Sequence, residues 1–344
     1  ANTGWIVGAN GRIQKTVNGG LSWQWQGGFT EVFRNIKMFD INNGIISGHN
    51  GIILKTSNSG LSWSQSAGMV SFYGMDAFDS QNIICVGSNK NYSKTTDGGV
   101  SWTHGVINAG GVGAHNFDIY GIEYLDLNTI LLSSSVISAL VIPVPVILRS
   151  TNGGNNFSVV ASWGYGDGFD NASLNDIEFS PSGNVGFACG SNGTIIRSSN
   201  GGVNWSVVMT SASDLRQIEF KNNDTAFVCG SGGQVFKTAN GGINWTSWPN
   251  TGTPYNLRTI SYADNFVSSA GVNGTFIRNN PVAAQVTVSG ANTGNGNYES
   301  LSDAFNGIGA GSQSGANINI TINTNITEPQ QGATPGNGDW ASVT

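Results

Sequence analysis

The stretch Lys237-Thr-Ala-Asn-Gly-Gly-Ile-Asn-Trp245 decides the fold, because close copies of it return along the chain. The six copies span residues 15–23, 55–63, 94–102, 149–157, 197–205 and 237–245. A motif that recurs about every 40 residues marks an array of supersecondary units, none of which can bury its apolar face alone. The sequence therefore predicts a repeat architecture.

Each repeat contains the signals of four short strands, which we call a, b, c and d. The Asn-Gly or Asp-Gly pair in the middle of the phrase favours a tight turn, since both residues tolerate positive φ. Strand c precedes this turn, as in residues 51–56 and 193–198, and strand d follows it. Upstream lie a glycine-bounded strand b, as in 226–230, and a strand a, as in 215–220. Four strands in about 40 residues indicate one blade of a β-propeller.

The phrase resembles the Asp-box (BNR) repeat, Ser/Thr-x-Asp-x-Gly-x-x-Trp. With its preceding Gly-x-Ile-x-Lys-Thr it is most similar to the photosystem II assembly/stability factor propellers and their secreted bacterial relatives. Five of the six boxes carry Asn where that family has Asp, and Ser59 replaces the first Gly of its box. The resemblance implies that the box residues are structural. They are Asn18, Trp23, Asn58, Trp63, Asp97, Trp102, Asn152, Phe157, Asn200, Trp205, Asn240 and Trp245.

The number of repeats predicts an all-β, seven-bladed propeller over residues 1–280. Five units are complete. The chain opens with strands b, c and d only (4–25) and closes with a, b and c only (256–280), where Asn279-Asn280-Pro281 stands in place of the box. A six-bladed ring is the alternative, if one terminal unit does not join.

Residues 281–344 differ in character and contain no box. Apolar spacing favours a short helix over 298–308, and alternating isoleucines favour a half-buried strand within 315–328. This part resembles the start of the β-helix-like modules of large secreted Bacteroidetes proteins. We expect a linker and the beginning of a β-helix-like or β-sandwich module that is truncated here. The chain would then be part of a longer polypeptide or assembly.

Composition narrows the functional classes. The 344 residues include 50 glycines and carry a formal net charge of −6, with no basic patch for nucleic acid. The longest apolar run, 130–148, contains a serine cluster and two prolines, so it is a poor membrane span. The start at Ala1 would suit a processed chain, which we expect to be extracellular or at the cell surface, and a fragment of a longer protein would begin in the same way. The three cysteines lie on strands of different blades, and the three histidines are scattered, so we expect no disulfide, metal or cofactor.

Catalysis deserves consideration because Asp-box propellers include sialidases. Glycoside hydrolysis needs a pair of carboxylates, or a tyrosine nucleophile with an acid partner, over a deep cleft. The carboxylates Asp76, Glu123, Glu178 and Glu219 instead recur at one strand-a position, and the sialidase Arg-Ile-Pro phrase is absent. Seven cations likewise recur at one strand-c position, which predicts scaffolding. They are Lys15, Lys55, Lys94, Arg149, Arg197, Lys237 and Arg278.

The parts that do not repeat are the candidates for binding. Insertions at 105–116, 136–145 and 162–173 should crowd one face near the fourth blade, and loops on a rigid scaffold commonly carry function. Their candidate contact residues are Leu140, Ile142, Trp163, Tyr165, Asp167, Phe169 and Asp170. The resemblance adds Arg34, Arg216 and Arg258, which match the strand-a arginines that form a partner-binding patch in the assembly-factor family.

These features together predict a non-enzymatic, secreted or cell-surface recognition or adhesion propeller that binds a protein or a glycan. An Asp-box glycosidase and a structural module of a surface filament or layer are the alternatives. Fold does not choose among the three. We expect no nucleic acid partner and no membrane span.

Overall fold

The structure is a computed structural model of the 344-residue chain. It describes residues 3–279 except 69, 111–116, 138–142, 164–171, 212, 249–250 and 264–265, and also 286–289, 296–298 and 319–322. The chain divides into two compact units, residues 1–264 with 268–277 and residues 265–267 with 278–344.

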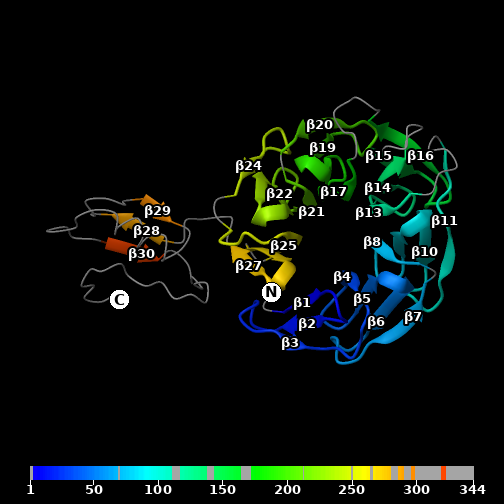
Figure 1. Cartoon of the computed structure of the whole chain (residues 1–344), viewed down its shortest axis with the longest axis horizontal. Helices are drawn as coiled ribbons and strands as arrows, with labels where there is room; N and C mark the ends of the chain where they lie inside the picture. Colours follow the sequence, from blue (N-terminus) through cyan, green and yellow to red (C-terminus); the bar gives the residue numbers. More distant parts are fainter. Residues whose placement is uncertain are drawn as a thin grey trace. The chain divides into compact units, whose positions relative to one another are not determined.

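Seven sheets stand around one axis as a seven-bladed β-propeller, so the seven-bladed prediction is confirmed (Figure 1). Blades 1 to 3 comprise β1 (Gly4–Val7), β2 (Ile13–Thr16), β3 (Gln24–Trp25); β4 (Phe33–Met38), β5 (Gly44–Gly48), β6 (Ile52–Thr56), β7 (Ser64–Ala67); and β8 (Phe72–Ala77), β9 (Ile83–Gly87), β10 (Asn91–Thr95), β11 (Thr103–Val106). Blades 4 and 5 comprise β13 (Ile119–Tyr124), β14 (Ile130–Ile137), β15 (Pro143–Ser150), β16 (Phe157–Ser162); and β17 (Leu174–Phe179), β18 (Gly186–Gly190), β19 (Ile195–Ser198), β20 (Ser206–Met209). Blades 6 and 7 comprise β21 (Leu215–Phe220), β22 (Ala226–Gly230), β23 (Val235–Thr238), β24 (Thr246–Ser247); and β25 (Leu257–Ala263), β26 (Phe266–Gly271), β27 (Phe276–Asn279).

As the sequence predicted, the first and last blades have three strands, b, c and d in blade 1 and a, b and c in blade 7. Blade 4 contains a strand that the sequence did not reveal. β12 (Ala109–Gly110), from the segment that leads into this blade, pairs in parallel with β16 and makes a fifth, outermost strand. Part of the first insertion therefore belongs to the sheet.

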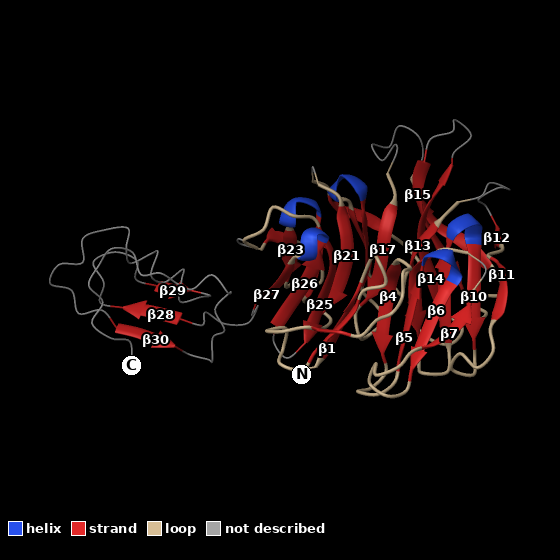
Figure 2. Ribbon diagram, turned by 60° about the horizontal axis from the view of Figure 1, so that its bottom comes forward, coloured by secondary structure: helices blue, strands red, loops and turns tan. Residues whose placement is uncertain are grey.

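The two faces of the propeller differ (Figure 2). On the loop face the inner strands begin, and single 3-10 turns connect strands b and c. These turns are η1 (His49–Gly51), η2 (Ser88–Lys90), η3 (Ser191–Gly193), η4 (Ser231–Gly233) and η5 (Val272–Gly274). On the opposite face, the box face, lie the repeated boxes and the turns between strands a and b.

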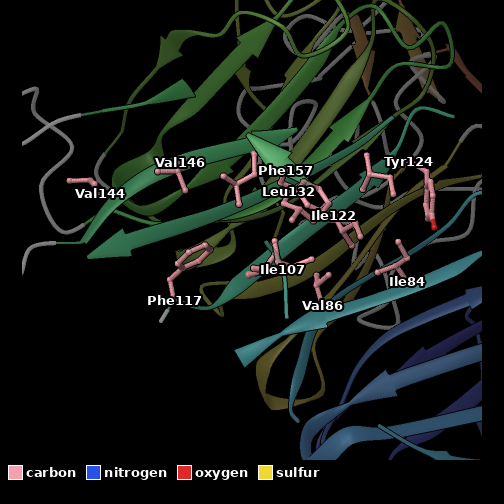
Figure 3. Packing of buried hydrophobic residues seen from close by; sticks show 13 residues of the cluster. Ile84, Val86, Ile107, Phe117, Ile122, Tyr124, Leu132, Val144, Val146 and Phe157 are labelled. Atoms are coloured by element: carbon pink, nitrogen blue, oxygen red, sulfur yellow. The ribbon is translucent and has the colours of Figure 1, made fainter. Parts of the chain in front are cut away.

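The apolar core lies between neighbouring blades. One cluster joins Ile84 and Val86 of blade 3 to Ile122, Leu132 and Phe157 of blade 4 (Figure 3). In the complete blades strand b is covered on both faces, and all five residues of β5, β9, β18 and β22 are buried. Burying these strands between adjacent sheets supplies the main driving force for folding.

Each box is a turn closed by its own side chains. In blade 5 the Asn200 Oδ1 atom accepts hydrogen bonds from Ser198 Oγ at 3.0 Å and from the Asn204 amide at 2.9 Å. The Ser198 Oγ atom accepts one from the Gly202 amide at 2.9 Å. The same pattern occurs in all six boxes, which explains why Asn and Asp are interchangeable there.

The strand-c cations connect successive blades. The Arg197 Nε atom donates to the Gly241 carbonyl of the next box at 2.6 Å, and Lys55 Nζ donates to Gly98 at 2.6 Å. Lys15, Lys94 and Arg149 make the corresponding bond to Ser59, Gly153 and Gly201. The expected scaffolding role is therefore present, with box carbonyls rather than carboxylates as the acceptors of these bonds.

The ring closes by side-chain packing between blades 1 and 7. The Trp23 ring of the first box lies edge-on to Phe276 of β27, with 5.2 Å between centroids. Blade 7 has no box and therefore no box tryptophan to pack against blade 6. Trp248 occupies the place that such a tryptophan would take. Trp245 of blade 6 packs on Phe187 of blade 5 at 5.1 Å, whereas the equivalent Phe227 of blade 6 receives Trp248 at 5.4 Å.

The second unit is described over one small sheet with strand order β29-β28-β30. Its strands are β28 (Val286–Ser289), β29 (Gly296–Tyr298) and β30 (Asn319–Ile322). β30 falls within the strand predicted for 315–328. Tyr298, the first residue of the predicted helix, belongs to strand β29 instead, and residues 299–308 of that helix lie outside the described residues.

Candidate functional site

Six side chains at the second position of the inner strands define the candidate site, which lies on the loop face around the axis. They are Arg34, Tyr73, Tyr120, Asn175, Arg216 and Arg258. In blades 2 to 6 this residue is the extra residue of a β-bulge in the pairing of strands a and b. Bulges redirect a side chain and commonly occur beside functional sites. The repeat therefore presents one side chain per blade at this end of the axis.

The three predicted arginines occur in consecutive positions around the ring, on blades 6, 7 and 2, because blade 1 has no inner strand. We call them the arginine cluster. Burial and the charges of Arg216 and Arg34 lower the pKa of Arg258. Arg216 forms an ion pair of 3.2 Å with Asp214, and Arg34 Nε donates to His49 Nε2 at 3.0 Å. Arg216 and Arg34 thus both lie near enough to Arg258 to act on it electrostatically.

Two tyrosines continue the site beyond Arg34, and the sequence analysis missed them. Tyr73 and Tyr120 stack with 5.6 Å between centroids and 27° between planes. The Arg34 guanidinium lies over the Tyr73 ring at 5.9 Å, and His49 lies edge-on to that ring. Burial, together with the nearby Asp118 carboxylate, raises the pKa of both phenols. Comparing the second residue of each inner strand would have revealed the pair.

The acceptor role of His49 requires a neutral imidazole whose Nε2 carries no proton. Burial first, and then the charge of Arg34, lower the pKa of His49. Both effects keep the ring neutral and hold Arg34 over Tyr73 near neutral pH. The resulting surface combines guanidinium groups with aromatic faces, which suits carboxylates and planar or apolar groups of a ligand.

Of the insertion residues predicted to contact a partner, the structure describes Trp163 alone. Trp163 is half-buried and packs against the core between blades 4 and 5, and its amide donates to the Pro145 carbonyl at 3.3 Å. Val144 is buried in the core between blades 3 and 4. The remaining predicted contacts, Leu140, Ile142, Tyr165, Asp167, Phe169 and Asp170, lie outside the described residues.

The repeated carboxylates of the inner strands are structural groups in this arrangement. Asp76 pairs with Lys37 at 2.7 Å and accepts the Tyr124 amide at 2.8 Å. Glu178 and Glu219 accept the amides of Phe220 and Tyr262 on the next inner strand at 3.3 and 3.0 Å. Burial raises the pKa of Glu123 and Glu178 well above its usual range and that of Glu219 to about 7. These groups link blades.

Within the described part of the chain, no group of three or more His, Cys, Asp or Glu residues could hold a metal ion. Nor does that part contain a helix of the length and apolar character that a membrane crossing requires.

The fold and the boxes together define the described propeller as a seven-bladed β-propeller with BNR-type repeats, similar to the assembly-factor propellers. Residues 156–272 match the family model described as photosynthesis system II assembly factor YCF48. No curated protein sequence matches the chain.

Two solved structures of YCF48 resemble this propeller, each at 18% identity with a TM-score of 0.61 over 80% of this chain. One is described as YCF48 bound to D1 peptide, of which 87% is covered, and the other is YCF48 from Cyanidioschyzon merolae, of which 91% is covered. An ancestral GH74 enzyme is 13% identical with a TM-score of 0.50, over 81% of this chain and 51% of that one. At such identities the likeness shows the fold alone.

Proposed function

We propose that this propeller is a non-catalytic module that binds a polypeptide through its loop face, with the arginine cluster and the Tyr73–Tyr120 pair as the contact surface. The observation that carries the proposal is the use of one bulged position, blade after blade, to place arginines and stacked tyrosines around the axis. The solved structure described as YCF48 bound to D1 peptide supports a polypeptide as the ligand of such a fold.

The chemistry of the surface favours a partner segment that contains acidic and aromatic residues. Arginine forms bidentate hydrogen bonds with carboxylates and stacks on planar groups. The tyrosine pair offers apolar faces together with hydroxyl groups. We further propose that the propeller acts outside the cell, on the basis of its resemblance to secreted propellers.

The inner-strand carboxylates are the groups that could serve a glycosidase, but they accept backbone amides of the neighbouring blade. Removing them would therefore weaken the contacts between blades, and we do not propose catalysis.

The test is binding to an array of acidic and neutral peptides, with and without aromatic residues, and to a glycan array. A variant with Arg34, Arg216 and Arg258 changed to Gln should lose acidic-peptide binding by about tenfold or more, since each charge-assisted hydrogen bond contributes about 1.5–3 kcal/mol. Lys221→Gln is the matched control, because Lys221 lies outside this surface, over the Tyr262 ring. Binding to glycans alone, or peptide binding that survives the triple change, would contradict the proposal.

A further inference from the structure

One repeated hydrogen bond on the loop face connects neighbouring blades, and we call it the turn latch. In four blades, the side chain of the residue just before the inner strand accepts an amide from the b–c turn of the preceding blade. The acceptors are Ser71 Oγ, Asp118 Oδ1, Asp214 Oδ1 and Asn256 Oδ1, at 2.8–3.2 Å. Because Ser and Asn make the latch as well as Asp, it requires an acceptor oxygen but no negative charge.

The two latch carboxylates differ in their surroundings. In blade 6, Asp214 forms an ion pair of 3.2 Å with Arg216, two residues further along the chain. In blade 4, the residue two places after Asp118 is Tyr120, which offers an uncharged phenol. Among the described residues, no cation lies within ion-pair distance of Asp118. Blade 4 therefore carries a negative charge that the latch does not need and that no described side chain neutralises.

Asp118 lies beside the tyrosine pair of the candidate site. Burial first, and then the charge of Asp118, raise the pKa of the Tyr73 and Tyr120 phenols, so the carboxylate acts on both rings. All three residues are half-buried, so part of each remains open to a ligand. An anionic oxygen and two aromatic rings thus lie together at the blade 4 end of the site.

The cations of the adjoining segments lie over rings and not beside this carboxylate. The Arg34 guanidinium lies over the Tyr73 ring at 5.9 Å. The Lys90 ammonium, from the turn that makes the latch with Asp118, lies over the Phe117 ring at 5.5 Å. The Arg34 contact shows that a ring of the tyrosine pair can accept a cation.

A carboxylate beside aromatic rings suits an ammonium or guanidinium group. The carboxylate accepts a charge-assisted hydrogen bond, and the electron-rich ring face attracts the cation. The same carboxylate repels an acidic group. The site therefore changes sign along its length, from the guanidinium groups of the arginine cluster to the carboxylate of Asp118.

We propose that Asp118 and Tyr120 form a subsite for a lysine or arginine side chain of the bound polypeptide, which we call the cation subsite. This proposal rests on the proposed function, because it specifies which partner sequence the loop face selects. The partner would place an acidic residue at the arginine cluster and a basic residue at the cation subsite. Asp118 would then determine specificity in addition to making its turn latch.

The probe is a set of short peptides that contain one glutamate and one tyrosine among glycine and serine residues, with a single lysine at each remaining position in turn. The control set carries norleucine in place of lysine, which keeps the apolar stem without the charge. At one spacing or more, the lysine peptide should bind at least about fivefold more tightly than its norleucine counterpart. A set in which no spacing favours lysine would overturn the proposal.

The decisive variant is Asp118→Asn. Its melting temperature should not change, because Asn256 makes the same latch at 2.8 Å. The preference for lysine should disappear, while the norleucine peptides should bind as before. Asp224→Asn is the matched control, since the net charge of −6 favours lysine everywhere and Asp224 is exposed in an a–b turn of the box face. That variant should keep the preference.

Two further measurements need no peptide. The phenols of Tyr73 and Tyr120 should titrate at lower pH in Asp118→Asn than in the parent, because a neighbouring negative charge has been removed. Methylguanidinium, at constant ionic strength, should shift the Tyr120 ring signals in nuclear magnetic resonance spectra of the parent but not of Asp118→Asn, and neutral methylurea should shift neither. Unchanged phenol titration, or the same response to methylguanidinium in both proteins, would contradict the proposal.

Each other outcome has a definite meaning. If a preference for lysine appears only after Lys90→Gln, the protein's own lysine occupies the subsite and the proposal is wrong. If Asp224→Asn loses the preference as Asp118→Asn does, the effect is one of net charge and the proposal is again wrong. If the arginine variant loses acidic-peptide binding while Asp118→Asn behaves as the parent, the cation subsite is wrong and the proposed function stands. If only Asp118→Asn changes binding, the cation subsite stands and the arginine cluster is not the contact surface.

Discussion

Trp248→Ala should destabilise the propeller strongly, although this tryptophan belongs to no box. Its side chain is 7% exposed, lies edge-on to Phe227 with 5.4 Å between centroids, and receives the Lys237 ammonium at 5.4 Å from its ring. Emptying a buried tryptophan site costs about 3–5 kcal/mol. For a domain of this size, each kcal/mol corresponds to a melting shift of about 2 °C or slightly more.

The assay is thermal unfolding monitored by circular dichroism, with urea unfolding as a second measure. We expect the melting temperature to fall by about 6–10 °C. Trp25→Ala is the control, since Trp25 is 53% exposed and its removal leaves no cavity. A Trp248→Ala protein that melts within about 1 °C of the parent would refute the idea that Trp248 replaces the missing seventh box.

The remaining predictions concern the box, the inner-strand carboxyls and the thiols. Asn200→Ala should cost about 1–2 kcal/mol in urea unfolding, because two acceptor bonds are lost, whereas Asn200→Asp should cost much less. Burial raises the pKa of Asp176 and Glu219 to about 7, above the unfolded values near 4, so the folded state holds these protons more tightly. The contribution of these two carboxyls to the free energy of unfolding should therefore be greatest below about pH 4 to 5 and should fall as the pH rises to about 7. The double change Asp176→Asn and Glu219→Gln should flatten this pH dependence. An unchanged slope of unfolding free energy against pH would contradict the assignment. The three cysteines, Cys85, Cys189 and Cys229, are buried free thiols, and burial raises the pKa of Cys85 and Cys229 to about 12. All three should resist alkylation in the folded protein and react alike in urea. A Cys189–Cys229 crosslink in the unreduced protein would contradict this prediction.

Much of the fold could be predicted because the boxes repeat in sequence. The turn residues around Asn200 or Asn240 carry the local signal, and counting them gave both the number of blades and the two three-stranded ends. The role of the strand-c cations was also predictable from their recurrence. Their acceptors were not, because the Gly241 carbonyl that Arg197 contacts belongs to the next repeat and carries no side-chain signal.

The candidate site was predictable only in part. The resemblance to the assembly-factor propellers identified the three arginines, Arg34, Arg216 and Arg258. It did not identify Tyr73 and Tyr120, because the resemblance concerns arginines at this second position of strand a and these two residues are aromatic. The bulges that direct these side chains depend on strand register, which local sequence does not fix.

The central claim is that the loop face, and not the box face, receives a polypeptide. A photoreactive phenylalanine analogue at Tyr120 places a crosslinker on the loop face, and the same analogue at Phe78, which is 47% exposed in a turn of the box face, is its matched control. Both proteins would be illuminated with a peptide that contains acidic and aromatic residues, and adducts would be located by mass spectrometry. The account predicts a peptide adduct at Tyr120 that disappears when the arginine cluster is changed to Gln, and none at Phe78. Equal adducts at both positions, or an adduct at Phe78 only, would contradict it.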